Sequence, residues 1–509
     1  MKTKSAFSGV VVLTGALIVV KVLSALYRVP YQNVLGDEGL YAYQQIYPIV
    51  ALGMILSMNA IPSAVTQTLG GHGTAQRYSM VLRYLQIVAI FITALLFLLA
   101  HPMAWMMGDV HLEIMIRAAS LSFLFVGVLG VLRGHYQSQQ LMTIPAISQV
   151  IEQIIRVTVI FVAIGLFILY GRTIYQAGML AILGSSVGFL GSSLYLIYHR
   201  PFKYMRQLDT TTIPWRRLML AVMVFAISQL LVILWQFIDS FTVVHMLKSN
   251  HLSFHEAIKQ KGIYDRGASF IQMGLIVTTT FSFVLIPLLT CALQEQQWNL
   301  MNRYANASLK ITILISSAAA VGLVNLLPLM NQVFFKTNSL VITLSVYMIT
   351  VILVSLIMMY IALLQVFNEV ATVMISVGIG LIVKGLLNIM LIYQLGILGA
   401  SVSTVLSLSV TGLICHQRVT TRYKMQGMGR FFIKLLASML VMSLVVQAVM
   451  WLIPTTGRIG GLLELLIAAF AGVGIFTWLI AEWRMLSYRE LKHLPYGDKL
   501  YHFKTRSRR

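Results

Sequence analysis

Basic side chains that lie within apolar stretches of the sequence could hold an anion away from bulk water. Lys21 and Arg28 are seven residues apart in one such stretch, a spacing that places both on one face of a helix. If that face lines a cavity, the two cations form a ladder for an anion; if it does not, Arg28 extends towards lipid headgroups. Lys384 lies in another apolar segment and requires a partner or water, because its insertion costs roughly 2.5 to 3.5 kcal/mol.

Acidic and amide side chains occur in two further apolar segments. Glu152 and Arg156 are four residues apart, which favours an ion pair along one helix; an ion-coupling site is the alternative. Gln236 and Asp239 share one helical face with Gln229. We expect this face to be a polar stripe that lines a cavity, where Asp239 contacts a ligand or a coupling ion.

Two short motifs occur twice, in the same order, and indicate an internal repeat. Residues 37–44 and 265–272 both read D-x-G-x4-Q, and residues 57–62 and 282–287 both read S-x3-I-P. An even number of spans in each copy predicts a parallel repeat, with two lobes related by an axis along the membrane normal. The repeated prolines are either paired hinges or bends without a mechanical role.

The repeat also places charged residues at equivalent positions. Asp37 and Glu38 of the first copy correspond to Asp265 and Arg266 of the second. Opposite charges could therefore meet where the two lobes close, and we predict an extracellular gate formed by these four residues. Loop charges that are solvated separately are the alternative.

The elements that position these residues must be membrane-spanning helices. The chain has 509 residues, 58% hydrophobic and 10% charged, and its mean hydropathy is +0.84. A soluble domain carries charge on roughly 25% of its residues, so most of this surface must face lipid. The composition excludes cytosolic enzymes, secreted domains and, despite a net charge of +22, nucleic-acid binders. We predict an all-α integral membrane protein without a nucleic-acid partner.

With about 20 apolar residues for each crossing, the sequence predicts fourteen transmembrane helices. We assign residues 1–199 to an N-terminal lobe of six helices and 217–416 to a C-terminal lobe of six, joined by a basic cytoplasmic linker over 200–216. Residues 417–485 hold two additional helices, and 486–509 form a basic tail. The fourteen helices are expected to begin near residues 6, 41, 79, 113, 143, 174, 217, 268, 306, 339, 369, 397, 431 and 459.

Lys and Arg residues concentrate in the loops on one side of these spans. The richest are residues 199–217, 418–434 and 504–509. By the positive-inside rule, this bias places both termini in the cytoplasm of a bacterial plasma membrane. The same loops are expected to contact anionic phospholipids.

Short motifs for catalysis or metal binding do not fit their sequence context. Residues 184–188 match G-x-S-x-G, but that nucleophile requires a strand-turn-helix; within a span, Gly184, Gly188 and Gly191 instead allow close helix packing. His251 and His255 lack H-E-x-x-H order, and no GxxxxGK[ST] phosphate loop occurs. We expect no catalytic residue and no metal or cofactor beyond a coupling ion, H+ or Na+, or the membrane potential.

Three segments carry a resemblance to a known family. They are LSALYRVPYQNVLGDEGLYAYQQIYPI (23–49), FIDSFTV (237–243) and GIYDRGASFIQMG (262–274). In a fourteen-span chain, this combination resembles the polysaccharide-biosynthesis membrane proteins of the multidrug/oligosaccharidyl-lipid/polysaccharide (MOP) exporter superfamily. It is most similar to the stage V sporulation protein B-like branch, which includes the lipid II flippases.

This resemblance implies two six-helix lobes around a central cavity, with two C-terminal helices added. It implies a flippase that moves an undecaprenyl-diphosphate-linked oligosaccharide, such as lipid II or a polysaccharide repeat unit, from the inner to the outer leaflet by alternating access. Lys21 matches a basic cavity position of such flippases, Arg28 is displaced by one residue from a second, and Arg266 resembles the basic residue at the start of helix eight. The implied partners are the lipid-linked glycan and proteins of cell-envelope synthesis.

The chemistry of the residues agrees with an anionic cargo. A diphosphate within an apolar protein needs groups that replace its hydration, and charge-assisted hydrogen bonds do so. The residues predicted to bind this substrate are Lys21, Arg28, Arg266, Lys384, Gln236 and Asp239.

Two other functions stay open. An ion-coupled multidrug antiporter of the same superfamily would need an acidic cavity, with Asp239 or Glu152 as its ion site; the excess of basic residues disfavours it. A membrane glycosyltransferase or polymerase usually needs paired external carboxylates, and Asp37 with Glu38 offers the one such pair. We therefore expect a transporter and not an enzyme.

Overall fold

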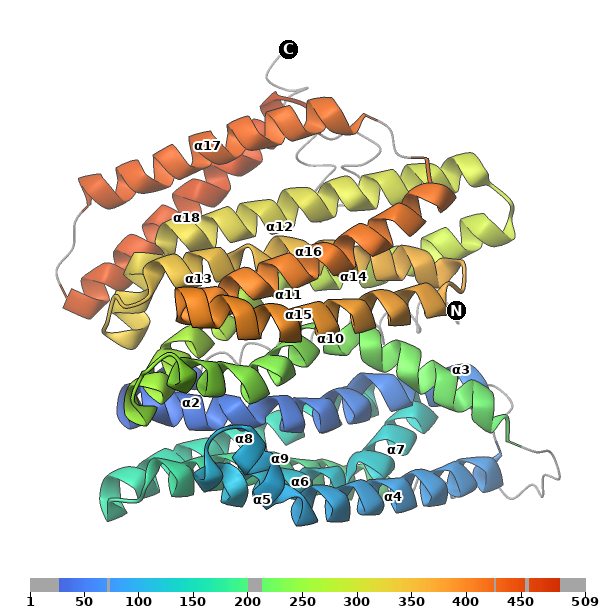
Figure 1. Cartoon of the computed structure of the whole chain (residues 1–509). Helices are drawn as coiled ribbons and strands as arrows, with labels where there is room; N and C mark the ends of the chain where they lie inside the picture. The colour runs from blue at the N-terminus through green and yellow to red at the C-terminus, as the bar shows by residue number, and fades with distance from the viewer. Residues whose placement is uncertain (1–26, 71–73, 200–212, 425–426, 454–456, 486–509) are drawn as a thin grey trace. The chain divides into compact units, whose positions relative to one another are not determined.

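The computed structural model describes residues 27–70, 74–199, 213–424, 427–453 and 457–485. The side chains of residues 228, 276–288, 290–291 and 294 also lie outside the description. Throughout the described residues, every regular element is a helix (Figure 1). The chain forms two compact units, which are described separately below. Unit 1 comprises Met1–Arg266 and Asn388–Ala400, and unit 2 comprises Gly267–Leu387 and Ser401–Arg509.

Unit 1 is built from helices that follow one another along the first half of the chain. Its core is formed mainly by α2, α6, α7 and α9, whose inward side chains are buried. The elements are α2 (Arg28–Ile55), the π-helix η1 (Leu56–Ala60), α3 (Ile61–Leu69), α4 (Ala75–Leu98), α5 (Ala100–Met106), the 3-10 helix η2 (Val110–Leu112), α6 (Glu113–Phe123), α7 (Val126–Ser138), α8 (Thr143–Tyr170), α9 (Ile174–Tyr198), α10 (Trp215–Ser249) and the first part of α11 (Phe254–Gln294).

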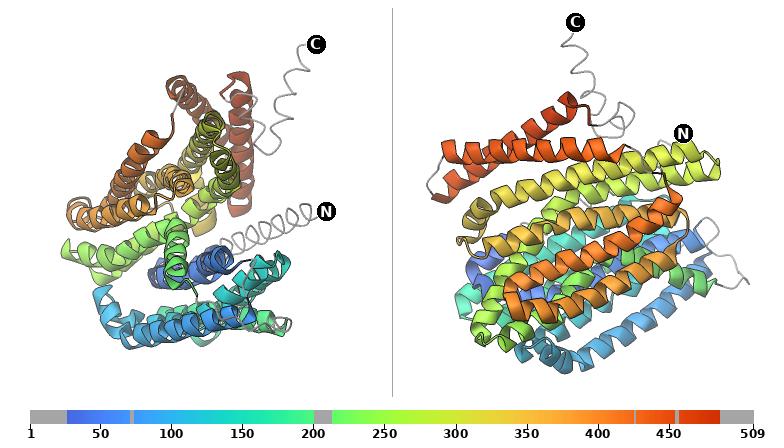
Figure 2. Two further views of the ribbon diagram at one scale, coloured as in Figure 1. Left: turned by 90° about the vertical axis from the view of Figure 1, so that its right-hand side faces the viewer. Right: turned by 45° about the horizontal axis from the view of Figure 1, so that its top comes forward.

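Unit 2 contains the remainder of α11 and the helices that follow it. α17 and α18 pack against each other and against α12, as both views in Figure 2 show. The elements are α12 (Trp298–Phe335), α13 (Val341–Met348), α14 (Thr350–Val366), α15 (Val370–Leu395), α16 (Ile397–Arg422), α17 (Met428–Leu452) and α18 (Gly457–Glu482). The end of α15 and the start of α16, Asn388–Ala400, belong to unit 1.

Twelve helices within the described ranges are long and apolar enough to cross a membrane. They coincide with twelve of the fourteen predicted spans. The first predicted span lies outside the described residues, and the eighth corresponds to α11. The chain is thus an all-helical, multi-pass membrane protein, whereas the count of fourteen spans and the assignment of two six-helix lobes stay predictions.

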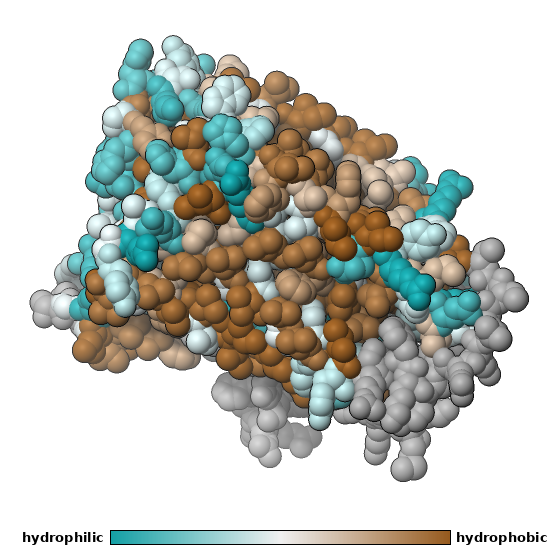
Figure 3. Space-filling view, turned by 90° about the horizontal axis from the view of Figure 1, so that it is seen from below, coloured by the Kyte–Doolittle hydropathy of each residue, from teal (hydrophilic) through white to brown (hydrophobic). Residues whose placement is uncertain are grey.

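The surface of the molecule agrees with this assignment. On the face seen in Figure 3, hydrophobic side chains form a broad central area and hydrophilic side chains gather at its margins. On α4, the exposed side chains include Ile87, Phe91 and Leu98. Exposed apolar side chains of this size are expected where a helix faces lipid.

Glycines on α9 bring it into close contact with α8, as the sequence predicts. A Cβ on Gly188 would lie 2.6 Å from the backbone oxygen of Glu152, and one on Gly184 would lie 3.0 Å from that of Arg156. The two backbones can approach because these positions have no side chain. The structural interpretation of the G-x-S-x-G sequence is confirmed.

Replacing Gly188 with alanine should therefore destabilise the protein. The added methyl group overlaps the α8 backbone, and overpacking of this kind costs about 1 to 3 kcal/mol. Gly165 on α8 is the matched control, because an added Cβ there meets no atom within 4 Å. We expect Gly188→Ala to lower the melting temperature in detergent and Gly165→Ala to leave it unchanged or raise it. Equal melting temperatures for the two variants would contradict the packing argument.

Candidate functional site

Gly36 breaks α2 into two helical parts and so positions the first group of predicted site residues. Its φ of 73° lies in the left-handed region that glycine adopts without strain. Asp37 follows directly, and Gln32 Nε2 donates to Asp37 Oδ1 at 2.9 Å across the break. The break therefore fixes the position of the Asp37 carboxylate.

Arg266 binds this carboxylate within unit 1. Arg266 Nε donates to Asp37 Oδ1 at 3.0 Å, and Nη2 contacts the same oxygen. The Arg266 side chain is fully buried, and that of Asp37 is 13% exposed. Residue 262 is a glycine because a Cβ there would overlap the backbone oxygen of Asp37. The close approach of α11 thus allows a charge-assisted pair that water hardly reaches.

The other two predicted gate residues have different partners. Glu38 Oε1 lies 3.0 Å from Nε2 of His255, whose side chain is exposed. Asp265 Oδ1 accepts a hydrogen bond from Lys261 Nζ at 2.5 Å. The structure therefore joins one of the two acidic residues of the first motif to Arg266 and not the other, and a gating role for the four residues stays a prediction.

Exchanging the charges of the buried pair tests its role. Arg266→Asp alone should leave Asp37 facing a second carboxylate, and breaking a buried pair costs about 3 to 5 kcal/mol. We expect each single reversal, Asp37→Arg or Arg266→Asp, to abolish the predicted transport and to lower the melting temperature. The double reversal should recover both quantities in part. Glu113→Gln is the control and should have little effect, because its partners Arg117 and His101 are 47% and 64% exposed. Failure of the double reversal to recover either quantity would argue against the pair.

Arg28 is buried within unit 1 among tyrosine side chains. It is 1% exposed, and its Cζ lies 5.1 Å from the centre of the Tyr47 ring. Tyr27 and Tyr43 share a hydrogen bond of 3.0 Å between their hydroxyl groups. The side chain therefore does not extend to lipid headgroups, which was one of the two alternatives for Arg28. The other alternative, a place in a cavity that holds an anion, stays a prediction. Lys21 lies outside the described residues.

Lys384 is buried in unit 2, where hydroxyl groups surround its ammonium. Its exposed fraction is 0%. Lys384 Nζ donates to Ser403 Oγ at 3.1 Å and to Thr404 Oγ1 at 2.6 Å, both on α16. These hydroxyl oxygens help to solvate the cation, and its function as a substrate contact stays a prediction.

Asp239 on α10 is a buried carboxylate within unit 1. It is 1% exposed and accepts hydrogen bonds from Tyr264 Oη at 3.1 Å and from Asn388 Nδ2 at 2.9 Å. Gln236 is half-buried on the same helix, and its backbone oxygen accepts from Ser240 Oγ at 3.2 Å. The Asp239 carboxylate of the predicted polar stripe thus faces hydrogen-bonding groups, while the contact of the stripe with a ligand or ion stays a prediction.

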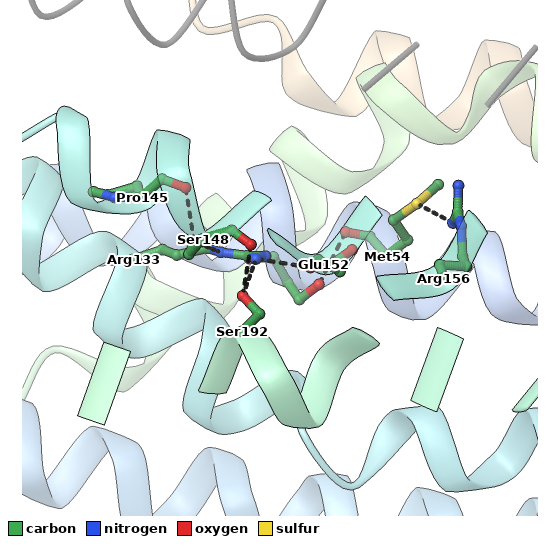
Figure 4. A network of polar contacts seen from close by, with 8 residues as sticks. Met54, Arg133, Pro145, Ser148, Glu152, Arg156 and Ser192 are labelled. Atoms are coloured by element: carbon green, nitrogen blue, oxygen red, sulfur yellow. Dashed lines mark hydrogen bonds and ion pairs between the residues drawn. The ribbon is translucent and has the colours of Figure 1, made fainter. Parts of the chain in front are cut away.

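The partner of Glu152 corrects the pairing predicted from spacing. Glu152 Oε2 accepts a hydrogen bond from Arg133 Nη2 on α7 at 2.7 Å, and both side chains are fully buried (Figure 4). Arg156 instead donates from Nη1 to the sulfur of Met54 at 3.1 Å. The i,i+4 spacing identified the helix face correctly, but the ion pair forms with a residue on a neighbouring helix.

Sequence reasoning missed two charged groups that the structure pairs. Arg133 lies in a helix rich in glycine and valine. A charged residue in so apolar a helix indicates a buried partner. Glu369, in the connection between α14 and α15, accepts hydrogen bonds from Arg418 Nη2 at 2.7 Å and from Arg422. These two guanidinium groups lower the pKa of Glu369 to about 2. In the part of the chain that is described, no three His, Cys, Asp or Glu residues lie together as a metal site would require.

Comparison with known proteins agrees with this architecture. The chain is 31% identical to the uncharacterized membrane protein YabM of Bacillus subtilis, over 98% of this chain and 97% of the relative. It is 23% identical to the lipid II flippase MurJ of Bacillus subtilis, over 92% of this chain and 94% of the relative.

Among solved structures, the lipid II flippase MurJ in its inward closed conformation matches with a TM-score of 0.68 at 15% identity, over 94% of this chain and 99% of that one. An inward-facing multidrug resistance MATE family transporter of the MOP superfamily matches with a TM-score of 0.63 at 16% identity, over 80% and 96%. These two likenesses show the fold.

The apolar helices and the charged groups buried among them define a multi-pass membrane protein. A family model described as polysaccharide biosynthesis protein matches residues 6–292, and the chain belongs to this family.

Proposed function

We propose that this protein is a transporter, a flippase for an undecaprenyl-diphosphate-linked oligosaccharide, such as lipid II or a polysaccharide repeat unit. It moves this cargo from the inner to the outer leaflet of the bacterial plasma membrane by alternating access, with both termini in the cytoplasm. The cargo has an anionic diphosphate and a long apolar tail, so a protein that carries it needs buried cations and an apolar channel for the tail.

The observation that carries the proposal is an apolar groove in unit 2. Its volume is about 510 Å³, and it lies between α11, α12, α17 and α18. Small residues leave the space open, and Met273 and Val473 at its edge are 43% and 64% exposed. A groove of this kind suits a polyprenyl chain, because its apolar walls offer van der Waals contacts along the length of the chain. A small hydrophilic cargo would gain nothing from it.

Buried cations suit the anionic diphosphate of the proposed cargo. Unit 1 buries Arg28 and Arg266, and unit 2 buries Lys384. An apolar protein interior disfavours an isolated diphosphate strongly, and guanidinium and ammonium donors compensate this cost with charge-assisted hydrogen bonds. We propose that these three residues, together with Lys21, Gln236 and Asp239, bind the headgroup.

Energy for the cycle is proposed to come from H+, Na+ or the membrane potential. Asp239, Glu152 and Arg156 are the proposed coupling residues, since each carries a buried charge. Anionic phospholipids and proteins of cell-envelope synthesis are the proposed partners. An ion-coupled multidrug antiporter is retained as an outcome of the test below.

Purified protein in liposomes tests the proposal. We expect the full chain to accelerate the transfer of lipid II between leaflets at least tenfold over protein-free vesicles, and to leave ethidium, a cationic dye, undisturbed. Accessibility of the headgroup to an added enzyme or a membrane-impermeant reagent measures the transfer. Gradient-driven transport of ethidium without movement of lipid II would overturn the proposal in favour of the antiporter.

A side chain placed in the groove should impair transport of long-tailed cargo. Gly322 lines the groove, and a Cβ there meets no atom within 4 Å, so Gly322→Leu projects into the space meant for the tail. Gly474 on α18 is equally unobstructed and lies outside the groove lining, which makes Gly474→Leu the matched control. We expect Gly322→Leu to slow transfer of the undecaprenyl substrate about tenfold and a short-tailed analogue much less. Equal slowing of both substrates would show that the groove does not hold the tail.

A further inference from the structure

The span formed by α2, η1 and α3 contains a turn whose backbone hydrogen bonds are incomplete. At the end of η1, the amide of Ile61 donates to the backbone oxygen of Leu56, five residues earlier, as in a π-helix. Residue 62 is proline and has no amide hydrogen. It can donate neither to Met58, four residues earlier, nor to Ser57, five residues earlier.

Arg133 on α7 supplies a donor at this break. Arg133 Nη1 lies 3.3 Å from the backbone oxygen of Ser57 and donates to it. Ser57 is fully buried, so water hardly reaches this oxygen. An unpaired backbone carbonyl in such a place costs about as much as a lost hydrogen bond, and the guanidinium replaces the bond that Pro62 removes.

Three further hydrogen bonds hold the guanidinium group in this orientation. Arg133 Nη2 donates to Glu152 Oε2 at 2.7 Å and to Ser192 Oγ at 2.9 Å, and Nε donates to Ser148 Oγ at 3.0 Å (Figure 4). Ser192 Oγ in turn donates to the backbone oxygen of Ser148 at 2.9 Å. Helices α8 and α9 therefore fix the plane of the guanidinium, and the guanidinium fixes the π-turn.

We propose that Arg133 is a positioning residue that clamps the π-turn before Pro62 and so sets the geometry at which α2 continues into α3. π-Turns and prolines are the sites at which long helices bend, and a clamp at such a site defines one bend. The clamp needs the planar fork of arginine, because one nitrogen must reach Glu152 while another reaches Ser57. A lysine side chain ends one bond earlier in a single nitrogen, so it cannot place donors at both of the positions that Nη1 and Nη2 occupy.

On a simpler interpretation, Arg133 only neutralises Glu152. The Arg133→Lys variant distinguishes this interpretation from the proposed clamp. Lysine keeps the charge and can pair with Glu152, but it leaves the Ser57 oxygen without its donor. Adding Pro62→Ala returns an amide hydrogen at position 62, which can bond to Ser57 or Met58. Pro145→Ala is the matched control, because Pro145 lies in the first turn of α8, where an amide hydrogen has no helical partner.

The experiment compares Arg133→Lys, Arg133→Lys with Pro62→Ala, and Arg133→Lys with Pro145→Ala, all in the full chain. Hydrogen–deuterium exchange over residues 56–61 reports on the clamp without any substrate, and residues 431–446 of α17 serve as the reference segment. We expect exchange in the π-turn to be about tenfold faster in Arg133→Lys, to return towards the wild-type rate with Pro62→Ala, and to stay fast with Pro145→Ala. Transfer of lipid II should follow the same order.

Two results would contradict the proposed clamp. One is exchange at the wild-type rate in Arg133→Lys. The other is faster exchange in Arg133→Lys that Pro62→Ala slows no more than Pro145→Ala does. If Arg133→Lys alone cannot be purified in folded form, recovery of folded protein on adding Pro62→Ala supports the clamp and no recovery contradicts it. The inference rests on the proposed function for its transport readout alone. Loss of lipid II transfer in the wild type would therefore reject that function while the exchange data still test the clamp.

Discussion

A charge or a freed backbone carbonyl inside a membrane protein must find its partner within the protein, because neither lipid nor water is there to solvate it. The arrangement of unit 1 follows from this constraint. Arg266 is buried against Asp37, and Arg133 is buried against Glu152 and the oxygen of Ser57. Each contact joins two different helices, so the constraint selects how the helices pack as well as which charges are tolerated.

The same constraint governs the buried cations of both units. In unit 1, Arg266 has a carboxylate partner in Asp37. In unit 2, the ammonium of Lys384 donates to the hydroxyl groups of Ser403 and Thr404. Under the proposed function, these cations bind the diphosphate of the cargo, and the apolar groove of unit 2 binds its tail.

Much of the fold could be predicted from the sequence, because hydropathy alone determines where a chain can cross a membrane. The predicted starts of the spans at residues 113, 143, 174 and 397 coincide with the first residues of α6, α8, α9 and α16. Helix starts near polar residues were less accurate: α11 begins at Phe254 and not near 268, because its amphipathic first turns carry charge and lower the local hydropathy.

The site was predictable where partners lie on one helix and not where they lie on several. Glu113 and Arg117 form an i,i+4 ion pair at 2.5 Å on a partly exposed face, as their spacing alone would predict. Glu152 has an equally spaced arginine, yet its ion pair is with Arg133, since a buried helix offers its side chains partners on neighbouring helices that spacing does not reveal. The repeat indicated that Arg266 meets an acidic residue of the first motif, but it did not distinguish Asp37, the partner in the structure, from Glu38.

Under the proposed function, one protein recognises both a diphosphate and a polyprenyl tail. Native mass spectrometry of the full chain, with equal concentrations of undecaprenyl diphosphate and undecaprenol, tests it most directly. The account predicts that undecaprenyl diphosphate binds at least tenfold more tightly and that Arg28→Ala removes most of this preference, while inorganic pyrophosphate competes weakly because it lacks the tail. Equal binding of the two lipids, or unchanged preference in Arg28→Ala, would contradict the account.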